Sequence, residues 1–253
     1  MRLALIVEYD GTAYSGFQYQ RDSPSIQEQL EKSIAALTCE ELRVRAAGRT
    51  DAGVHALGQV VAFDTGTTHS PATVLRAMNY RLPDDIAVKA VYRVAANFDP
   101  RRDALSRLYR YTVSTGPVRS PLKRLTTVLV HERLDAERMK RAARLFEGVH
   151  DFAMFGGALE DPGASTVREV FSARVSSKDE EIVFKVAGSA FLPHQVRRMA
   201  GALVDVGRGA LSDEELKLMI DRNESGAVSR TLPPQGLCLV EVKYADFPPL
   251  TSE

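Results

Sequence analysis

The order of short apolar strands and capped helices along the chain is the feature that most restricts the folds it can adopt. In the first hundred residues, apolar runs typical of strands stand at 3–9, 42–47, 56–64 and 86–94. Two segments with apolar residues at helical spacing lie between them, and each is opened by a serine, Ser25 or Ser70. The first part of the chain therefore predicts the order β-α-β-β-α-β.

The second part follows the same order without an obvious repeat of sequence. Helices are expected after Asp135, from about 194 to 206, and after Ser212, and strands at 108–114, 127–131, 167–176, 181–188 and 237–244. We therefore predict an α+β protein of two ferredoxin-like, RRM-like β-α-β-β-α-β units. The expected domains are residues 1–104 and 105–253. RRM-type sheets often read single-stranded RNA, although a fold alone does not determine function.

Composition sets the broad class but does not select a partner. The 253 residues contain 33 Lys and Arg against 33 Asp and Glu, so the zero net charge does not by itself indicate nucleic-acid binding. The two cysteines, Cys39 and Cys238, are too few for a disulfide framework, which favours a cytoplasmic protein. No apolar run approaches the length of a membrane span, so no membrane association is expected.

Positive charge is concentrated between residues 93 and 124. Only Asp99 and Asp103 oppose its eight basic residues, which are Arg93, Arg101, Arg102, Arg107, Arg110, Arg119, Lys123 and Arg124. Such a run is either ordinary solvated surface or a surface that binds a polyanion. Composition does not decide between the two.

The segment Gly48–His55, which reads Gly-Arg-Thr-Asp-Ala-Gly-Val-His, joins two predicted strands. Its two glycines frame a base, a hydroxyl and an acid, so the loop can turn tightly and admit a substrate closely. Residue chemistry alone favours a structural turn with an Arg49–Asp51 pair. A catalytic carboxylate at Asp51 is the alternative.

This unbroken segment resembles the signature of the family of tRNA pseudouridine synthase A, also called the TruA type. Further stretches resemble motifs of the same family at 8–11, 79–86, 107–111, 191–199 and 234–237. The resemblance covers most of the chain. It implies that Asp51 is the catalytic residue and that the fold is a pseudouridine synthase core.

The resemblance also implies partners for Asp51. Arg197 would pair with it and keep it ionised, because an adjacent guanidinium lowers the pKa of a carboxylate. Tyr109 would stack on the extruded base and accept a sugar proton, and Arg49 would hold that base outside the stack. Taken singly, Tyr109 would be a core aromatic and Arg197 a surface residue. His55 is interpreted as structural.

The implied reaction converts uridine to pseudouridine at positions 38, 39 and 40 of the tRNA anticodon arm. The base leaves C1′, rotates and rejoins through C5, so no metal or organic cofactor is needed. Whether Asp51 adds to the sugar or promotes an elimination stays open. The family also implies a homodimer, with one tRNA contacting both subunits.

Phosphate contacts supply most RNA affinity, and the candidates for them in the basic run are Arg101, Arg102, Arg107 and Arg110. The resemblance adds Arg168, which stands where the family often has an arginine that contacts tRNA. One stretch departs from the family. Where many members have Phe-His-Ala-Arg-Phe-Ser-Ala, residues 98–104 are Phe-Asp-Pro-Arg-Arg-Asp-Ala. The RNA contacts that the family makes through this stretch therefore do not carry over directly to this chain.

Two rival functions are visible. Asp64-Thr65-Gly66 matches the short motif of aspartic proteases, which need two such acids sharing a proton. A tandem RNA-binding module without catalysis is the second rival, but it lacks aromatic-rich strands and leaves the Gly48–His55 loop unexplained. Replacing Asp51 with Asn separates a binder from an enzyme.

Overall fold

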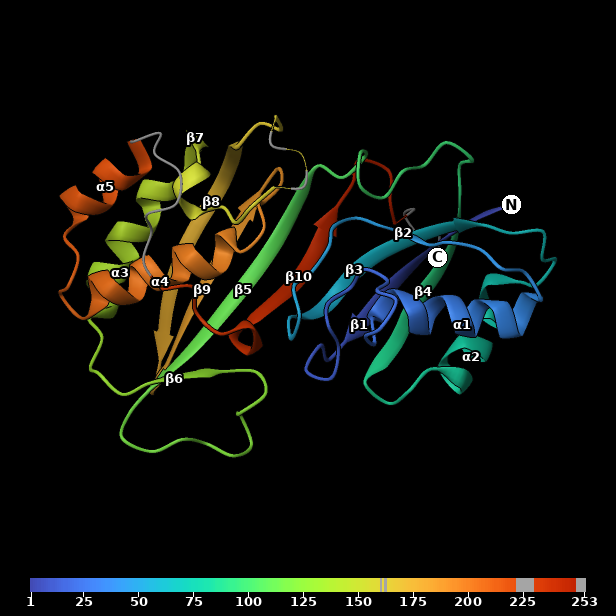
Figure 1. Ribbon diagram of the computed structural model, residues 1–253, viewed down its shortest axis with the longest axis horizontal. Coiled ribbons are helices and arrows are strands. Elements are labelled where there is room, and N and C mark those ends of the chain that lie inside the picture. Colours follow the sequence, from blue (N-terminus) through green and yellow to red (C-terminus); the bar gives the residue numbers. More distant parts are fainter. Residues whose placement is uncertain (160, 162, 222–229, 249–253) are drawn as a thin grey trace. The chain divides into compact units, whose positions relative to one another are not determined.

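The computed structural model describes residues 1–159, 161, 163–221 and 230–248, and it confirms the mixed α+β class (Figure 1). The chain divides into two compact units. Unit 1 comprises Met1–Ser106 together with the residues from Leu239 onward, and unit 2 comprises Arg107–Cys238. The closing strand thus groups mostly with unit 1. The division into 1–104 and 105–253 stays a prediction about where the chain separates into domains.

Unit 1 has the predicted β-α-β-β-α-β order. Its elements are β1 (Arg2–Tyr9), α1 (Ile26–Thr38), β2 (Arg45–Ala46), β3 (His55–Asp64), α2 (Pro71–Arg81) and β4 (Ile86–Val94). The strands lie in the order β4-β1-β3, and β2 pairs with β3. All of these pairs are antiparallel, which is the arrangement of a ferredoxin-like unit. The last strand, β10 (Leu237–Lys243), also lies beside β3.

Local signals in the sequence explain both helices of unit 1. The Ser25 side chain caps α1 by accepting a hydrogen bond from the Glu28 amide, and Ser70 caps α2 from the Thr73 amide in the same way. Pro71 then occupies the first turn of α2, where its missing amide hydrogen costs nothing. The strand predicted at 42–47 is shorter than expected, because only Arg45–Ala46 pairs with β3.

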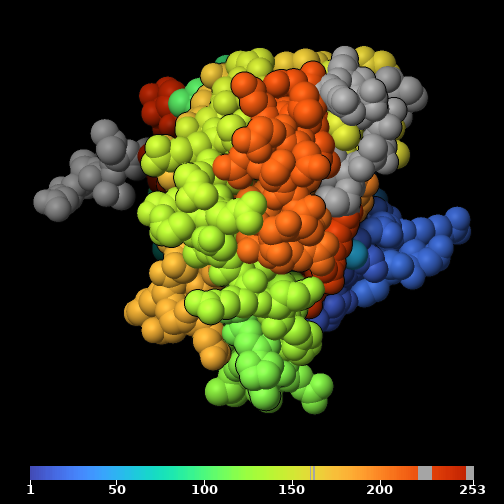
Figure 2. All heavy atoms as spheres, turned by 90° about the vertical axis from the view of Figure 1, so that its left-hand side faces the viewer, coloured from blue at the N-terminus to red at the C-terminus, as the bar shows by residue number. Residues whose placement is uncertain are grey.

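Unit 2 contains more elements than the sequence predicted. They are β5 (Ser106–Thr115), β6 (Val128–Val130), α3 (Ala136–Ala143), β7 (Gly148–Asp151), β8 (Val167–Lys178), β9 (Glu181–Gly188), α4 (Gln195–Gly207) and α5 (Asp213–Asp221). Strands β5-β9-β8-β7 lie in that order with antiparallel pairing, and β6 runs parallel to β5. Figure 2 shows α3 and α5 side by side at the surface, with the loop at 116–127 projecting below them.

The third helix ends earlier than predicted. The sequence placed its end at Gly148, whereas α3 stops at Ala143 and a 3-10 turn, Arg144–Phe146, continues the chain. Gly148, with a φ of 111°, then starts β7, a strand that was not predicted. Four residues at the edge of a sheet carry too little periodicity to be recognised from sequence.

Each unit has its own apolar core. In unit 1 the largest fully buried side chains include Phe63 of β3 and Leu30 of α1. In unit 2 an aromatic cluster forms around Phe146, whose ring meets that of Phe155 edge to face at 5.3 Å between centroids. Within the part of the chain that the structure describes, no helix is both long and apolar enough to cross a membrane.

Candidate active-site loop and basic surface

Asp51 lies in unit 1, in the loop that connects β2 to β3. Along this loop the side chains alternate between solvent and core: Arg49 is exposed, Thr50 is buried and Asp51 is half-buried. The basic and acidic groups are therefore accessible, while the hydroxyl between them points into the protein. This is the arrangement expected of a loop that presents reactive groups from a rigid backbone.

Backbone hydrogen bonds hold the loop on the segment that follows β1. The Phe17 amide donates to the Thr50 carbonyl at 3.1 Å, and the Gly53 amide donates to the Tyr14 carbonyl at 3.2 Å. Within the loop, the Val54 amide donates to the Asp51 carbonyl at 3.1 Å, which closes the turn. These bonds fix the backbone on both sides of Asp51.

His55 anchors the start of β3, which agrees with a structural role. Its ring is buried, and its Nδ1 lies 3.1 Å from both the Gly11 amide and the Asp10 carboxylate. Partial burial acts to raise the pKa of Asp10, but hydrogen bonds from Thr12 and the charge of the His55 ring lower it below the usual value. Among the described residues, no cluster of three or more His, Cys, Asp or Glu is placed to hold a metal ion.

Tyr109 lies on β5 in unit 2 and is buried. Its ring packs edge to face against Phe191, with 5.3 Å between centroids. Side chains alternate along the strand, so Arg107 and Tyr109 share one face while Arg110 belongs to the other. Arg107 is itself buried and donates to the Ser189 carbonyl at 2.7 Å, which is a structural contact.

Arg197 lies in the first turn of α4, shortly after Phe191. Its Nε donates to the Leu232 carbonyl at 2.7 Å, and its Nη1 lies 3.1 Å from Nδ1 of His194. Burial raises the pKa of the nearby Tyr111 far above its usual range, while the charge of Arg197 acts in the opposite direction. Unit 2 therefore holds a fixed guanidinium beside a neutral phenol.

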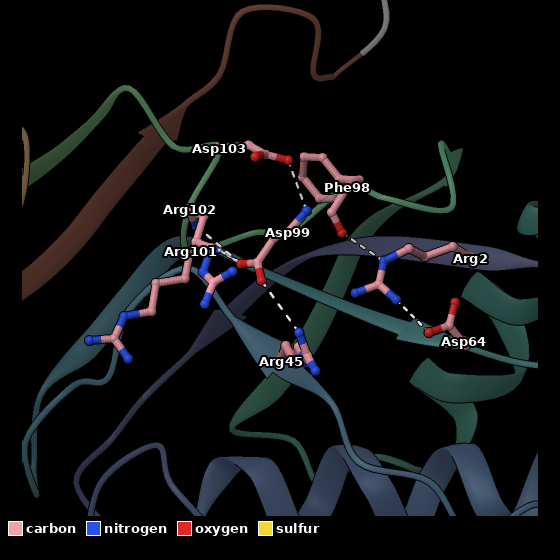
Figure 3. A network of polar contacts seen from close by, with 8 residues as sticks. All are labelled: Arg2, Arg45, Asp64, Phe98, Asp99, Arg101, Arg102 and Asp103. Carbon is pink, nitrogen blue, oxygen red and sulfur yellow. Dashed lines mark hydrogen bonds and ion pairs between the residues drawn. The ribbon is translucent and has the colours of Figure 1, made fainter.

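The stretch at 98–104, which departs from the family pattern, forms a closed turn (Figure 3). One carboxylate oxygen of Asp99 accepts the amides of Arg101 and Arg102 at 2.9 and 3.1 Å, and Asp103 accepts the Asp99 amide at 2.8 Å. The other oxygen of Asp99 lies 3.4 Å from Nη1 of Arg45 on β2. The turn leaves all three arginine side chains exposed.

Hydrogen bonding maintains the charge of Asp99. Burial acts to raise its pKa, but the amides of Arg102 and Arg101 and the charge of Arg45 lower it below the usual value. The turn is therefore stabilised while the carboxylate is ionised, and this stabilisation is lost as pH falls through the depressed pKa. The ionised Asp99 carboxylate thus binds two backbone amides of the turn and lies beside the guanidinium of Arg45.

The protease-like tripeptide has a structural use in the same region. Arg2 donates to the Phe98 carbonyl at 2.7 Å and pairs with Asp64 at 2.5 Å (Figure 3). The Thr65 hydroxyl donates to Glu40 at 2.6 Å. These contacts tie the end of β3 to neighbouring segments, and they account for the tripeptide without catalysis.

The predicted residues are thus distributed over both units. Unit 1 holds Arg49 and Asp51 on one loop and Arg101 and Arg102 on one turn. Unit 2 holds Tyr109, which packs against Phe191, and Arg197 on α4, as well as Arg107, Arg110 and Arg168. Arg168 donates to the carbonyls of Ser165 and Val167 at 2.7 and 2.6 Å. Sequence reasoning missed Arg45, which only the pairing of β2 with β3 brings beside Asp99.

The two glycines of the loop should respond differently to alanine. Gly53 has a φ of 76°, so Gly53→Ala should lower the free energy of unfolding by about 1–2 kcal/mol. A Cβ at Gly48 would meet nothing within 4 Å, so Gly48→Ala should change it by less than about 0.5 kcal/mol. Denaturant unfolding followed by circular dichroism measures both. Equal losses would contradict this description of the loop.

Comparison with known proteins identifies relatives that all belong to one family. A family model described as tRNA pseudouridine synthase matches residues 5–101 and 142–245. Proteins named tRNA pseudouridine synthase A are similar over nearly their whole length. The one from Geotalea uraniireducens is 43% identical over 96% of this chain and 99% of its own, and the one from Pelobacter propionicus is 42% identical over the same shares. That of Myxococcus xanthus is 43% identical over 98% and 94%.

Proposed function

Because this chain belongs to the tRNA pseudouridine synthase family, we propose that it isomerises uridine to pseudouridine in the anticodon arm of tRNA, at positions 38, 39 and 40. The observation that carries the proposal is the Gly48–His55 loop. It presents Asp51 half-exposed on a backbone that is hydrogen-bonded on both sides. Neither an aspartic protease built on Asp64 nor a non-catalytic RNA-binding module requires a carboxylate held in this way.

The chemistry requires one carboxylate and no redox partner. The bond between N1 of uracil and C1′ breaks, the base rotates, and a bond from C5 to C1′ forms. The hydrogen at C5 leaves as a proton, and N1 gains one, so atoms and electrons balance. Asp51 serves either by adding to C1′ or by promoting loss of the C2′ proton. Both routes need it ionised at the start, and neither needs a cofactor.

Three further residues complete the proposed machinery, as the family resemblance implies. Tyr109 stacks on the extruded uracil and accepts a sugar proton, and its packing against Phe191 supports a fixed ring orientation. Arg197 keeps Asp51 ionised, and its bond to the Leu232 carbonyl supports a fixed guanidinium. Arg49 is exposed on the catalytic loop, where it can hold the extruded base outside the stack.

The RNA backbone is proposed to lie on exposed arginines. The Asp99 carboxylate accepts the amides of Arg101 and Arg102 on one turn of unit 1 and lies 3.4 Å from Nη1 of Arg45 on β2 (Figure 3). The exposed side chains of these three arginines support contact with RNA phosphates. Arg107, Arg110 and Arg168 stay predictions as RNA contacts. We also propose that the enzyme acts in the cytoplasm as a homodimer, with one tRNA contacting both subunits.

The catalytic role of Asp51 is tested by Asp51→Asn. The amide has nearly the same shape but cannot act as an anionic nucleophile or base, so turnover should fall by at least about 10³-fold while tRNA binding is kept. Tritium release from tRNA that carries 5-tritiated uridine measures turnover, and filter binding measures affinity. Release by the variant at the wild-type rate would remove Asp51 from the mechanism.

The basic turn is tested by the salt dependence of tRNA binding. Arg101→Ala and Arg102→Ala should each weaken binding and reduce the magnitude of the slope of log K against log salt by about 1. The reason is that binding releases fewer counterions when one phosphate contact is missing. Arg76→Ala, which removes an exposed arginine from α2, is the matched control and should leave the slope unchanged. A slope that changes equally in all three variants would contradict a localised phosphate site.

A further inference from the structure

Two polar side chains are buried beneath the Gly48–His55 loop, where the apolar core of unit 1 would otherwise continue. Tyr9 ends β1 and is 2% exposed, and Gln59 lies within β3 and is 0% exposed. A buried polar group without a partner costs about 1–3 kcal/mol, so such residues persist where they are bonded. Their bonding partners lie in the catalytic loop.

Each side chain holds the loop at a different point. The Tyr9 hydroxyl lies 2.8 Å from Oγ1 of Thr50, and Nε2 of Gln59 donates to the Gly48 carbonyl at 2.8 Å. The two are also connected to each other, since Nε2 of Gln59 lies 3.5 Å from the Tyr9 hydroxyl. The Val60 amide donates to Oε1 of Gln59 at 3.2 Å, which orients the amide group.

Strand pairing explains why these two residues meet. Val7 of β1 lies directly opposite Gln59 of β3, and Tyr9 follows Val7 by two residues, so both side chains belong to one face of the sheet. The register shifts between Val7 and Tyr9, and such irregularities redirect side chains at the end of a strand. The loop therefore sits over a platform made by the two central strands of unit 1.

We propose that Tyr9 and Gln59 are positioning residues that set the orientation of Arg49 and Asp51. The inference rests on the proposed function and adds residues that do not touch the substrate. The Gly48 carbonyl and the Thr50 side chain flank Arg49, and Thr50 directly precedes Asp51. Fixing both points restricts the peptide units that carry the two reactive side chains.

The competing explanation is that the pair only stabilises the fold. The two explanations differ in what they predict for catalysis. A displacement of about 1 Å in a catalytic group can cost about 10²-fold in rate, whereas a purely structural bond alters the folded fraction and leaves the turnover of folded molecules unchanged. The ratio of kcat to folded fraction therefore separates them.

The test uses tritium release from 5-tritiated tRNA by Tyr9→Phe, Thr50→Val, Gln59→Leu and the double variant Tyr9→Phe/Thr50→Val. All are assayed well below their unfolding temperatures. We expect kcat to fall by about tenfold or more in each single variant, with KM within about twofold of wild type. Because Tyr9 and Thr50 share one bond, the double variant should lose no more than the worse single variant. Thr50→Ser, which keeps the hydroxyl, should restore most of the activity.

Thr65→Val is the matched control. Thr65 and Thr50 are both 6% exposed, and Thr65 also makes a side-chain hydrogen bond, but it lies at the opposite end of β3 from the loop. Its kcat should equal that of wild type.

The outcomes separate this inference from the proposed function. A wild-type protein that releases no tritium would overturn both. An active wild type, with kcat unchanged in Tyr9→Phe and Gln59→Leu, would overturn the positioning role and leave the function intact. A kcat that falls only in proportion to the folded fraction, or that falls equally in Thr65→Val, would also overturn it.

Discussion

The hydrogen bond between the Tyr9 hydroxyl and Thr50 connects the core of unit 1 to the loop that carries Asp51. A carboxylate on a glycine-framed loop is accessible, but such a loop loses precision unless something fixes it. The two central strands provide that fixation through Tyr9 and Gln59, and the segment after β1 adds backbone bonds. The β-α-β-β-α-β fold matters here because it places β1 beside β3, and so places both anchors under one loop.

Much of the fold could be predicted because its signals are local. The caps at Ser25 and Ser70, the bounds of β4 and β9, and the reciprocal bonds between Ser212 and Glu215 at the start of α5 depend on residues a few positions apart. The short edge strand β7 depends on pairing with β8, which periodicity does not report. The early end of α3 depends on the 3-10 turn that follows it, which has no such sequence signal either.

The candidate site divides in the same way. The Gly48–His55 motif is contiguous, so the family resemblance alone was enough to propose Asp51 as the catalytic residue. Gln59, however, is one polar residue in an apolar strand, and its role emerges only from the pairing of β1 with β3. Asp99 is similar: the sequence showed a departure from the family, whereas the structure shows that its carboxylate builds a turn that presents Arg101 and Arg102. A chain of zero net charge can in this way expose neighbouring arginines.

The catalytic role proposed for Asp51 in the anticodon arm is tested most directly by incubating one unmodified tRNA with wild-type protein and with Asp51→Asn. Pseudouridine is then mapped at nucleotide resolution in both products. We expect new pseudouridine at positions 38, 39 or 40 with the wild type and none with the variant. Pseudouridine at the same positions with both proteins, or none with the wild type on several tRNAs, would contradict the proposed role.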